Sequence, residues 1–428
     1  MLEGGGVRAR LEVKARYPKR FTGKTLLFDT VTSWRDCGAE EPRSGYRAAM
    51  RAVVWHGKED VRVDEVPDPR LVEPTDAIVR ITSTAICGSD LHLYGGKVIK
   101  MKEGDIVGHE PMGIVEEVGP QAGEHLEPGD RVVVPFNISC GRCYFCEQQL
   151  FSQCETTAAH EHGKGASLFG YTHLYGGVPG GQAQYLRVPQ AHFGPIKVPE
   201  GPPDERFLFL SDVLPTAWQA VVYADVPRGG TLAVYGLGPI GQMSCRIAYH
   251  LGAGRVIGID PVPERRAMAE RHGVETIDPD TVEDPATEVL RLTGRGADAV
   301  VDAVGMEAEG SKFDSVMQAT KLQMDRTEAL RKAMGSVRRG GTLSLSGVYV
   351  GLEQLFPLGD LFDKQVQLRM GQANVRRWTD EILPLLTDED PLGVHDLTTH
   401  RLPLERAPEA YEMFQAKRDG AIKVVLAP

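Results

Sequence analysis

Four cysteines within fifteen residues form the strongest chemical pattern in the chain. They are Cys140, Cys143, Cys146 and Cys154. Thiolates this close together can converge on one tetrahedral Zn²⁺, which leaves no coordination position open for a substrate. Two disulfides are the alternative, but the first fifty residues contain no secretory signal that would direct the chain to an oxidising compartment. We therefore expect a structural zinc site.

A second group of residue types suited to metal binding lies earlier in the chain. Cys87 opens the run Cys-Gly-Ser-Asp-Leu-His, and His109 follows about twenty residues later in Gly-His-Glu. A catalytic zinc needs three protein ligands and a fourth position for water or substrate. A single cysteine or histidine is more often a packing residue, and spacing does not identify a third ligand. Together the two runs predict part of an open metal site.

A glycine-rich turn supplies the pattern for a nucleotide site. The apolar run 231–235 leads directly into Gly236-Leu-Gly238-Pro239-Ile240-Gly241 and a helix-forming stretch, and Asp260 ends the next apolar run. Strand, glycines, helix and acid in this order predict a dinucleotide site, with the pyrophosphate at the helix N-terminus. An ordinary strand-to-helix turn is the alternative.

The cofactor preferred by this site depends on charge. Asp260 would accept hydrogen bonds from the adenosine ribose and repel a 2′-phosphate, which favours NAD over NADP. Arg265 and Arg266 follow closely and could partly offset that repulsion.

Periodicity divides the chain into regions that must position these residues. From residue 50 to 212 short β-runs alternate with turns, which predicts an antiparallel β domain. From 213 to 374 apolar strands alternate with helical stretches, which predicts parallel βαβ units. The region 375–428 ends in the strand-like run 422–426 and is expected to return to the β domain. Residues 1–49 read as a leader of unknown role, either disordered or a mis-assigned start. The fold class is α/β.

Charge and composition exclude several functions. The formal charge of −11 and the absence of a basic stripe oppose a nucleic-acid partner. No apolar run approaches the length of a membrane span, so we expect no membrane partner. The odd number of seven cysteines suits a reducing, cytoplasmic location.

The motifs together resemble the zinc-dependent medium-chain alcohol dehydrogenases. The matching runs are Cys87-Gly-Ser-Asp, Gly108-His-Glu, the four-cysteine lobe, Gly236 to Gly241 and Val301-Asp-Ala-Val-Gly305. The branch most similar is the formaldehyde dehydrogenase-like one, through Val134-Pro-Phe-Asn, Leu210-Ser-Asp212-Val-Leu-Pro-Thr216 and Met370-Gly-Gln372. The resemblance covers residues 50–428. It implies a GroES-like β-rich catalytic domain, a Rossmann doubly wound domain, two zinc ions per subunit, and a homodimer or homotetramer.

The resemblance also implies roles for the catalytic residues. Cys87, His109 and Asp212 would bind the catalytic zinc, which acts as a Lewis acid on the substrate oxygen while hydride moves to or from NAD. Helix capping is the alternative role for Asp212. Ser89 and His92 would carry the alcohol proton to solvent; turn capping and a surface position are their alternatives.

Two carboxylates beside the ligands complete the expected site. Asp90 would orient His109. Glu110 would either move into the open metal position when water leaves or stand behind the ligands.

Further expectations concern the cofactor. The backbone of Val348 would contact the nicotinamide carboxamide, and Gly371 and Gln372 would line the same cleft. The segment 307–331 is longer than a simple connection, and we expect it to fold over the adenosine half of NAD and slow its release.

The predicted function is a dehydrogenase that uses zinc and NAD to interconvert a small, formaldehyde-like alcohol or aldehyde. The alternatives are a larger secondary alcohol or polyol, S-hydroxymethylglutathione, a zinc-free quinone reductase, or a non-catalytic nucleotide-binding protein on the same fold. The stretch 155–175, with His160, His162 and His173, is expected to approach the substrate pocket as a solvated loop, and a third metal site there is the weaker alternative.

Overall fold

The computed structural model describes residues 49–305, 328–347 and 357–428. All of them belong to one compact unit that spans 47–428. Almost all of the predicted leader, Val348 and most of 307–331 lie outside the described residues, so the expectations placed on them are not addressed by the structure.

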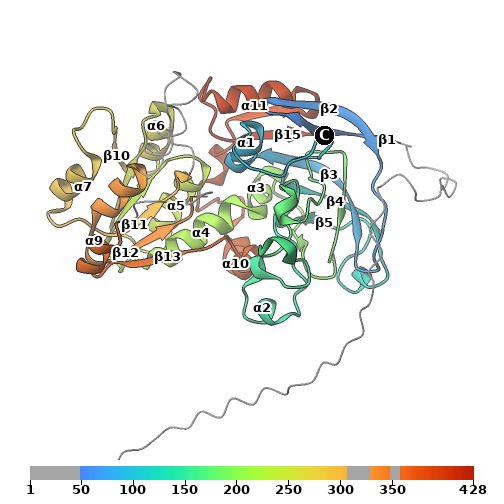
Figure 1. The fold of residues 1–428 in the computed structure, drawn as a ribbon, viewed down its shortest axis with the longest axis horizontal. Coiled ribbons are helices and arrows are strands. Elements are labelled where there is room, and N and C mark those ends of the chain that lie inside the picture. The colour runs from blue at the N-terminus through green and yellow to red at the C-terminus, as the bar shows by residue number, and fades with distance from the viewer. Residues whose placement is uncertain (1–48, 306–327, 348–356) are drawn as a thin grey trace, which may run out of the picture. The chain divides into compact units, whose positions relative to one another are not determined.

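A β-rich half holds the first set of predicted motifs (Figure 1). β1 (Ala49–Gly57) and β2 (Asp60–Pro67) form an antiparallel hairpin. Beside it, a seven-stranded sheet has the order β14-β15-β3-β4-β5-β7, with β6 paired to β3. Its strands are β3 (Ala77–Ile86), β4 (Glu110–Val118), β5 (Arg131–Val133), β6 (Tyr185–Val188), β7 (Ile196–Lys197), β14 (His400–Pro403) and β15 (Val424–Ala427). The pairing is antiparallel as predicted, except that β14 and β15 run parallel.

The C-terminal strands enter this sheet next to the first metal motif. β15 pairs with the end of β3, with Val424 opposite Ile86 and Val425 opposite Ala85. β3 leads directly into Cys87. The pairing therefore brings residues more than three hundred positions apart to the same place.

A six-stranded parallel sheet forms the second half, with the order β10-β9-β8-β11-β12-β13. Its strands are β8 (Thr231–Tyr235), β9 (Arg255–Ile259), β10 (Glu275–Ile277), β11 (Ala297–Asp302), β12 (Val337–Leu345) and β13 (Gln367–Met370). The chain reverses direction across the sheet between β8 and β11, and nucleotides bind at such a reversal, outside the carboxyl ends of the strands. This is the predicted doubly wound arrangement, and it confirms the α/β fold class.

Helices cover the sheets and join the two halves. They are α1 (Gly88–Tyr94), α2 (Tyr144–Glu147), α3 (Asp204–Leu208), α4 (Val213–Ala224), α5 (Pro239–His250), α6 (Pro263–Arg271), α7 (Pro285–Thr293), α9 (Leu358–Asp363), α10 (Val375–Ile382) and α11 (Ala407–Gln415). α4 packs against α5, α10 and β12. The largest buried apolar cluster runs through α4 and contains residues from both halves, such as Phe209 and Val234. One continuous core therefore fixes the β-rich half against the parallel sheet.

Within the described ranges no single helix is long and apolar enough to cross a bilayer. The bent pair Asp204–Ser211 and Val213–Ala224 meets the criteria of length and composition only when the two helices are taken together.

Candidate active site

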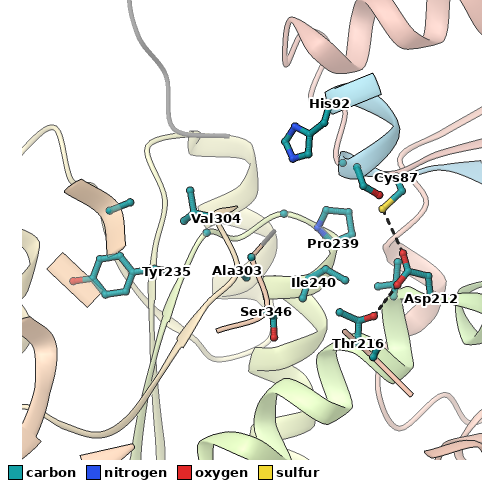
Figure 2. Close-up of a pocket in the computed structure, with 18 of the residues that line it drawn as sticks. Cys87, His92, Asp212, Thr216, Tyr235, Pro239, Ile240, Ala303, Val304 and Ser346 are labelled. Carbon is teal, nitrogen blue, oxygen red and sulfur yellow. Dashed lines mark hydrogen bonds between the residues drawn. The ribbon is translucent and has the colours of Figure 1, made fainter. Parts of the chain in front are cut away.

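Four side chains that can bind metal meet at one point. The ligand atoms of Cys87, His109, Glu110 and Asp212 all lie within 4.8 Å of one another. Cys87, His109 and Asp212 line a cavity of about 810 Å³ that continues along the glycine-rich turn. Figure 2 shows Cys87 and Asp212 beside Pro239 and Ile240 of that turn. The cluster is therefore open to a molecule in that cavity.

The start of α1 fixes the position of Cys87. Cys87 is the N-cap residue, and its N–H donates to Asp90 Oδ2 at 2.9 Å. Its sulfur lies 3.4 Å from Asp212 Oδ2. Burial, and then the Asp212 carboxylate, raise the pKa of the Cys87 thiol to about 11. Ionisation of this thiol at neutral pH therefore requires a cation close to the sulfur.

His109 is held between two carboxylates. Its Nδ1 lies 3.0 Å from Asp90 Oδ1 and its Nε2 lies 3.5 Å from Asp212 Oδ2. Burial favours the neutral ring, but the charges of Asp90 and Cys87 and the contacts with both carboxylates outweigh it and raise the pKa of His109. An Asp90 carboxylate at Nδ1 leaves Nε2 facing the cluster, which is the orientation that a metal-binding imidazole needs.

Asp212 occupies the N-cap position of α4, but its side chain does not cap the helix. Its Oδ1 instead accepts a hydrogen bond from the Thr216 hydroxyl at 2.7 Å, and its Oδ2 faces the cluster (Figure 2). Burial opposes ionisation, but contacts with His109 and Thr216 outweigh it and lower the pKa of Asp212. The geometry therefore favours an ionised carboxylate directed at the cluster over helix capping.

Glu110 is the fourth member of the cluster and contacts a lysine that sequence reasoning missed. Both side chains are fully buried, and Lys423 Nζ lies 2.5 Å from Glu110 Oε1 and 3.0 Å from the Ile86 carbonyl oxygen. Burial raises the pKa of Glu110. Burial opposes the charge of Lys423, but attraction to Glu110 outweighs it and raises the pKa of Lys423. The signal in the sequence was a lone lysine inside the apolar run 422–426.

The donor set fits a zinc ion. Glu110 Oε2 is buried and has no hydrogen-bond partner, and Glu110 contributes a carboxylate oxygen to the cluster of ligand atoms. A thiol, two carboxylates and one imidazole therefore offer four donors to a single ion, which binds the thiol as thiolate and the imidazole in its neutral form. Sulfur, imidazole and carboxylate ligands together are typical of zinc.

The four cysteines of the first motif form a second cluster of ligand atoms within 4.8 Å. All six cysteines in the described part of the chain are free, and the Sγ atoms of Cys143 and Cys154 lie 3.9 Å apart. Burial raises the pKa of Cys146, whereas backbone N–H groups of Cys146 and Glu155 outweigh burial and lower the pKa of Cys143 to about 6. These sulfurs fit a closed Zn²⁺ site, because all the ligands are sulfur and three of them are buried.

The glycine-rich turn has the close packing that a dinucleotide site requires. Gly236 has φ +84°, and a Cβ on Gly241 would lie 1.8 Å from the Gly236 carbonyl oxygen. Gly238 is the N-cap of α5 and Pro239 its first residue. Gly236, Gly238, Pro239 and Ile240 line the cavity, whereas Gly241 packs behind the turn. The N-terminus of α5 therefore borders the cavity, where helix N-termini favour an anion such as a pyrophosphate.

Asp260 and Arg265 lie together at the next strand end. The Asp260 carboxylate accepts the N–H groups of Leu237 at 2.7 Å and Val262 at 2.8 Å, and Arg265 Nη1 lies 3.6 Å away. Both residues line the cavity. Each carboxylate oxygen keeps a second lone pair for a ribose hydroxyl.

Some of the other predicted site residues line the cavity, and others do not. Ser89, His92, Gly371 and Gln372 line it. Asp90 and Glu110 do not, since both are buried behind the ligands.

The substrate side of the cavity is apolar and aromatic. Phe136 and Tyr171 meet the His109 ring edge-on, with centroid distances of 6.2 and 6.5 Å. The further lining residues on this side are Val98, Lys164, Leu168, Phe169, Leu174 and Tyr175. The stretch 155–175 therefore does approach the pocket.

The three histidines of that stretch do not gather into a metal cluster. His173 contacts Asp105 at 3.0 Å, His162 contacts Lys100 at 3.3 Å, and His160 contacts the Glu155 carbonyl oxygen. Within the described ranges, the two clusters above are the groups of three or more His, Cys, Asp or Glu side chains whose ligand atoms converge.

A parallel sheet with a dinucleotide turn, next to an open metal cluster, defines a nucleotide- and metal-dependent oxidoreductase. Comparisons with known proteins agree. Residues 73–200 match the alcohol dehydrogenase GroES-like domain and residues 239–324 match the zinc-binding dehydrogenase family.

Individual relatives give the same result. An uncharacterized zinc-type alcohol dehydrogenase-like protein of Bacillus subtilis, AdhB, is 42% identical over 382 residues, which cover 89% of this chain and all of the relative. A glutathione-independent formaldehyde dehydrogenase of Pseudomonas aeruginosa is 32% identical over 86% of this chain and 95% of its own length. Among solved structures, alcohol dehydrogenase TADH from Thermus sp. ATN1 is similar with a TM-score of 0.75 and 38% identity, over 88% of this chain and 99% of the other.

The chain belongs to the zinc-type medium-chain alcohol dehydrogenase family. It is therefore a zinc-dependent oxidoreductase that uses NAD(P). This confirms the enzyme class and the family resemblance that the sequence motifs indicated.

Proposed function

We propose that the protein oxidises alcohols and reduces aldehydes with NAD at the cluster of Cys87, His109 and Asp212. The observation that carries the proposal is that these three side chains converge in the same cavity as the glycine-rich turn. A cofactor bound at the turn and a substrate held at the cluster would therefore share one enclosed space, as direct hydride transfer requires.

When bound, zinc would supply Lewis acidity at the substrate oxygen, and the nicotinamide would exchange a hydride. The chain supplies the proton path. Ser89 and His92 are three residues apart on α1, so they lie on one helix face, and both line the cavity. Ser89 would accept the alcohol proton and His92 would pass it towards solvent.

The buried carboxylates would act by orientation. Asp90, at 3.0 Å from Nδ1 of His109, holds the imidazole with Nε2 towards the metal position. Lys423 holds one oxygen of Glu110, which leaves Oε2 as a further possible ligand.

On the cofactor side, Gly236, Gly238 and the N-terminus of α5 would hold the pyrophosphate, and Gly371 and Gln372 would border the nicotinamide. The charge of Asp260 favours NAD over NADP, with Arg265 as a partial counterweight. The four-cysteine lobe would hold the second, structural zinc.

We place the domain boundaries after Asp212 and before Val375, because α4 and α10 begin there. A cytoplasmic location and a homodimer or homotetramer complete the proposal. Free cysteines support the former and family membership supports the latter; light scattering on the eluted peak would measure the assembly.

Two classes of substrate are compatible with the proposed function. The formaldehyde dehydrogenase relative favours a small aldehyde. The aromatic and apolar wall from Phe136 to Tyr175 favours a larger body, because a one-carbon substrate would leave most of that wall without a contact. We favour the larger alcohol on this observation.

Metal analysis and a spectrophotometric panel of alcohols and aldehydes test the function. We expect two zinc ions per subunit and NADH formation with at least one class of alcohol, with NAD preferred over NADP. Asp212→Ala should retain the lobe zinc, lose most of the catalytic zinc and lower turnover at least about a hundredfold.

Cys245→Ala is the matched control. Cys245 is a fully buried thiol on α5 that belongs to neither cluster, so this variant should keep both ions and full activity. Full zinc content and activity in Asp212→Ala would exclude the proposed ligand set.

A further inference from the structure

A lysine without a counter-ion lies on the wall of the substrate cavity. Lys164 lines the cavity, and its ammonium is 5.9 Å from the centroid of the Tyr175 ring. In the part of the chain that the structure describes, no carboxylate forms an ion pair with it. A cation over an aromatic face is held in a preferred direction but keeps its charge available to a ligand.

Aromatic rings connect this lysine to the metal cluster. The Tyr171 ring lies 6.5 Å from the His109 ring, and Tyr175 lies 5.8 Å from Tyr171. All three rings and Lys164 border the same cavity or its walls. Two tyrosine rings, Tyr175 and Tyr171, therefore lie in sequence between the ammonium and the His109 imidazole.

Two acidic side chains contact histidines of the stretch 155–175. Asp105 contacts His173 at 3.0 Å, and Glu161 contacts His162 at 3.3 Å. Lys100 adds a second ammonium, 3.3 Å from the His162 ring. Although the whole chain carries a formal charge of −11, the Lys164 ammonium on the cavity wall forms no ion pair with a carboxylate of the described residues.

We propose that Lys164 binds a carboxylate at the far end of the substrate, so that the substrates are alcohols and aldehydes with an aromatic or long aliphatic body and a terminal carboxylate. The inference rests on the proposed function. It places the aromatic or aliphatic part of the substrate against Tyr171 and Tyr175, and the reacting alcohol or aldehyde group at the metal cluster. The alcohol loses hydride to NAD⁺ and its hydroxyl proton to solvent, and the carboxylate is unchanged.

Charge complementarity explains why such a substrate is selected. Burial of the apolar part of the substrate against the cavity wall is favourable. The substrate carboxylate also gives the Lys164 ammonium an ionic partner that a neutral substrate does not offer. A neutral alcohol of the same size fills the wall but leaves Lys164 without a ligand.

Matched substrates test the inference. We compare benzyl alcohol with its para-carboxylate, and octanol with its ω-carboxylate, in the zinc-loaded enzyme with NAD. The wild type should prefer the anionic member about tenfold in kcat/KM, which corresponds to one well-placed charge contact. Lys164→Met should lose this preference while the neutral substrates change less than about twofold, and Lys164→Arg should keep it.

Charge reversal and a distant lysine provide the controls. Lys164→Glu should favour the neutral alcohol. Lys197→Met, at an exposed lysine that pairs with Asp130 and does not line the cavity, should behave as the wild type.

A binding measurement separates failure of this inference from failure of the proposed function. Calorimetry with terephthalate and terephthalamide requires no turnover, and Lys164→Met should weaken only the former, about tenfold. If no alcohol is oxidised but terephthalate binding depends on Lys164, the proposed function is wrong and the anion site stands. Equal kcat/KM for both members of each pair in the wild type, or equal losses for both in Lys164→Met, would overturn the inference.

Discussion

The buried pair of Glu110 and Lys423 shows how a lysine can fix a carboxyl group beside a candidate metal site. Neither side chain is exposed, and Lys423 also lies 5.8 Å from the centroid of the Phe209 ring. Glu110 Oε1 contacts the ammonium, while Oε2 has no hydrogen-bond partner. The lysine thus fixes the Glu110 carboxyl group beside Cys87 and Asp212.

Replacing Lys423 measures how much this ion pair contributes to the free energy of unfolding. Lys423→Met leaves a buried carboxylate without its counter-ion, and breaking a buried pair in this way costs about 3–5 kcal/mol. We expect a matching fall in the free energy of unfolding, measured by urea denaturation of the zinc-loaded enzyme.

Two variants control this result. Lys423→Met combined with Glu110→Gln should recover much of the stability, because no uncompensated charge remains. Lys197→Met breaks a surface pair with Asp130, at 2.7 Å, and should cost less than about 1 kcal/mol. If Lys423→Met lowers the free energy of unfolding by no more than the surface variant does, the charges of Lys423 and Glu110 do not stabilise the fold.

Sequence reasoning reached the metal-type residues more readily than the residues that hold them. Cys87, His109 and the four cysteines lie in short runs whose residue types seldom gather for packing alone. Asp212 required the resemblance, because a carboxylate before a helix is usually a cap. Lys423 was missed because its partner Glu110 is more than three hundred residues away, and only the pairing of β15 with β3 brings them together.

At the scale of elements, α4 carries contacts from the metal cluster to the cofactor cleft. Asp212, Thr216 and Gln219 lie four and three residues apart, so they share one face of the helix. Gln219 is 2% exposed and donates to the carbonyl oxygens of Gly371 and Gln372, at 3.1 and 3.2 Å. The helix that begins at the candidate ligand Asp212 therefore also fixes the segment of Gly371 and Gln372 on the cavity wall.

The same glutamine connects this segment to the cysteine lobe. Its Oε1 accepts N–H groups of Asn374 and Trp378. Asn374 Oδ1 in turn accepts the backbone N–H and hydroxyl of Ser152, which lies in the chain between Cys146 and Cys154. A structural zinc in the lobe would thus stiffen one wall of the cofactor site.

Removing the amide should disturb cofactor binding more than chemistry. Gln219→Leu leaves two carbonyl groups and three donor groups buried without this partner, which should cost about 3 kcal/mol of stability. Because the displaced segment carries Gly371 and Gln372, we expect the KM for NAD to rise about tenfold with a smaller change in kcat. Steady-state kinetics at saturating alcohol measures both constants.

Ser152→Ala is the matched control for this network. It removes the hydroxyl contact with Asn374 but keeps the backbone one, so it should cost less than about 1 kcal/mol and leave the KM for NAD unchanged. Equal effects on KM and kcat in Gln219→Leu would mean that the network only supports the fold.

The strands of the parallel sheet were predicted where their apolar runs were strong. β8 has the predicted bounds, 231–235, and β9 (Arg255–Ile259) is the next apolar run, which ends just before Asp260 as expected. β10 and β13 were missed because both lie at the sheet edges, where alternation with polar residues and short length weaken the signal.

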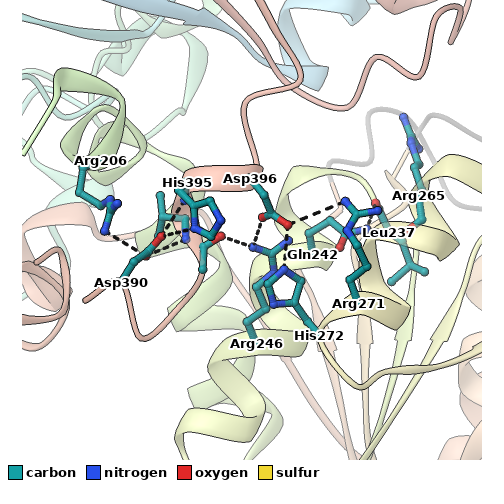
Figure 3. A network of polar contacts seen from close by, with 12 residues as sticks. Arg206, Leu237, Gln242, Arg246, Arg265, Arg271, His272, Asp390, His395 and Asp396 are labelled. Carbon is teal, nitrogen blue, oxygen red and sulfur yellow. Dashed lines mark hydrogen bonds and ion pairs between the residues drawn. The ribbon is translucent and has the colours of Figure 1, made fainter. Parts of the chain in front are cut away.

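At the scale of the whole molecule, a partly buried ionic network joins the parallel-sheet half to the C-terminal segment (Figure 3). Asp396 lies 2.6 Å from Arg246 Nη1 on α5 and 2.9 Å from Nε2 of His272, which follows α6. Asp390, six residues earlier, contacts Arg206 on α3 of the β-rich half at 3.4 Å. The segment 390–396 therefore holds helices from both halves. Charge pairs between distant segments follow from the assembled fold, so no pattern in the sequence indicated this network.

Asp396→Asn tests the network through its pH dependence. Burial opposes ionisation, but His272 and Arg246 outweigh it and lower the pKa of Asp396. The unfolded chain has an ordinary aspartate with a pKa of about 3.9, so it binds the proton more readily than the folded protein. The stabilisation is therefore fully present above that value and is lost as the pH falls through the lower pKa of the folded state. At pH 7 the substitution should cost about 2 kcal/mol, the value of charged hydrogen bonds.

The measurement is the difference in unfolding free energy between wild type and Asp396→Asn across this range. It should stay constant from neutral pH down to about pH 5 and shrink below about pH 4, because only the wild type loses a charge there. Asp388→Asn, at an exposed aspartate eight residues earlier, should stay within about 0.5 kcal/mol at every pH. A difference that persists undiminished into acid would mean that Asp396 acts through its shape, and that the two halves are joined by the apolar core through α4 and not by charge.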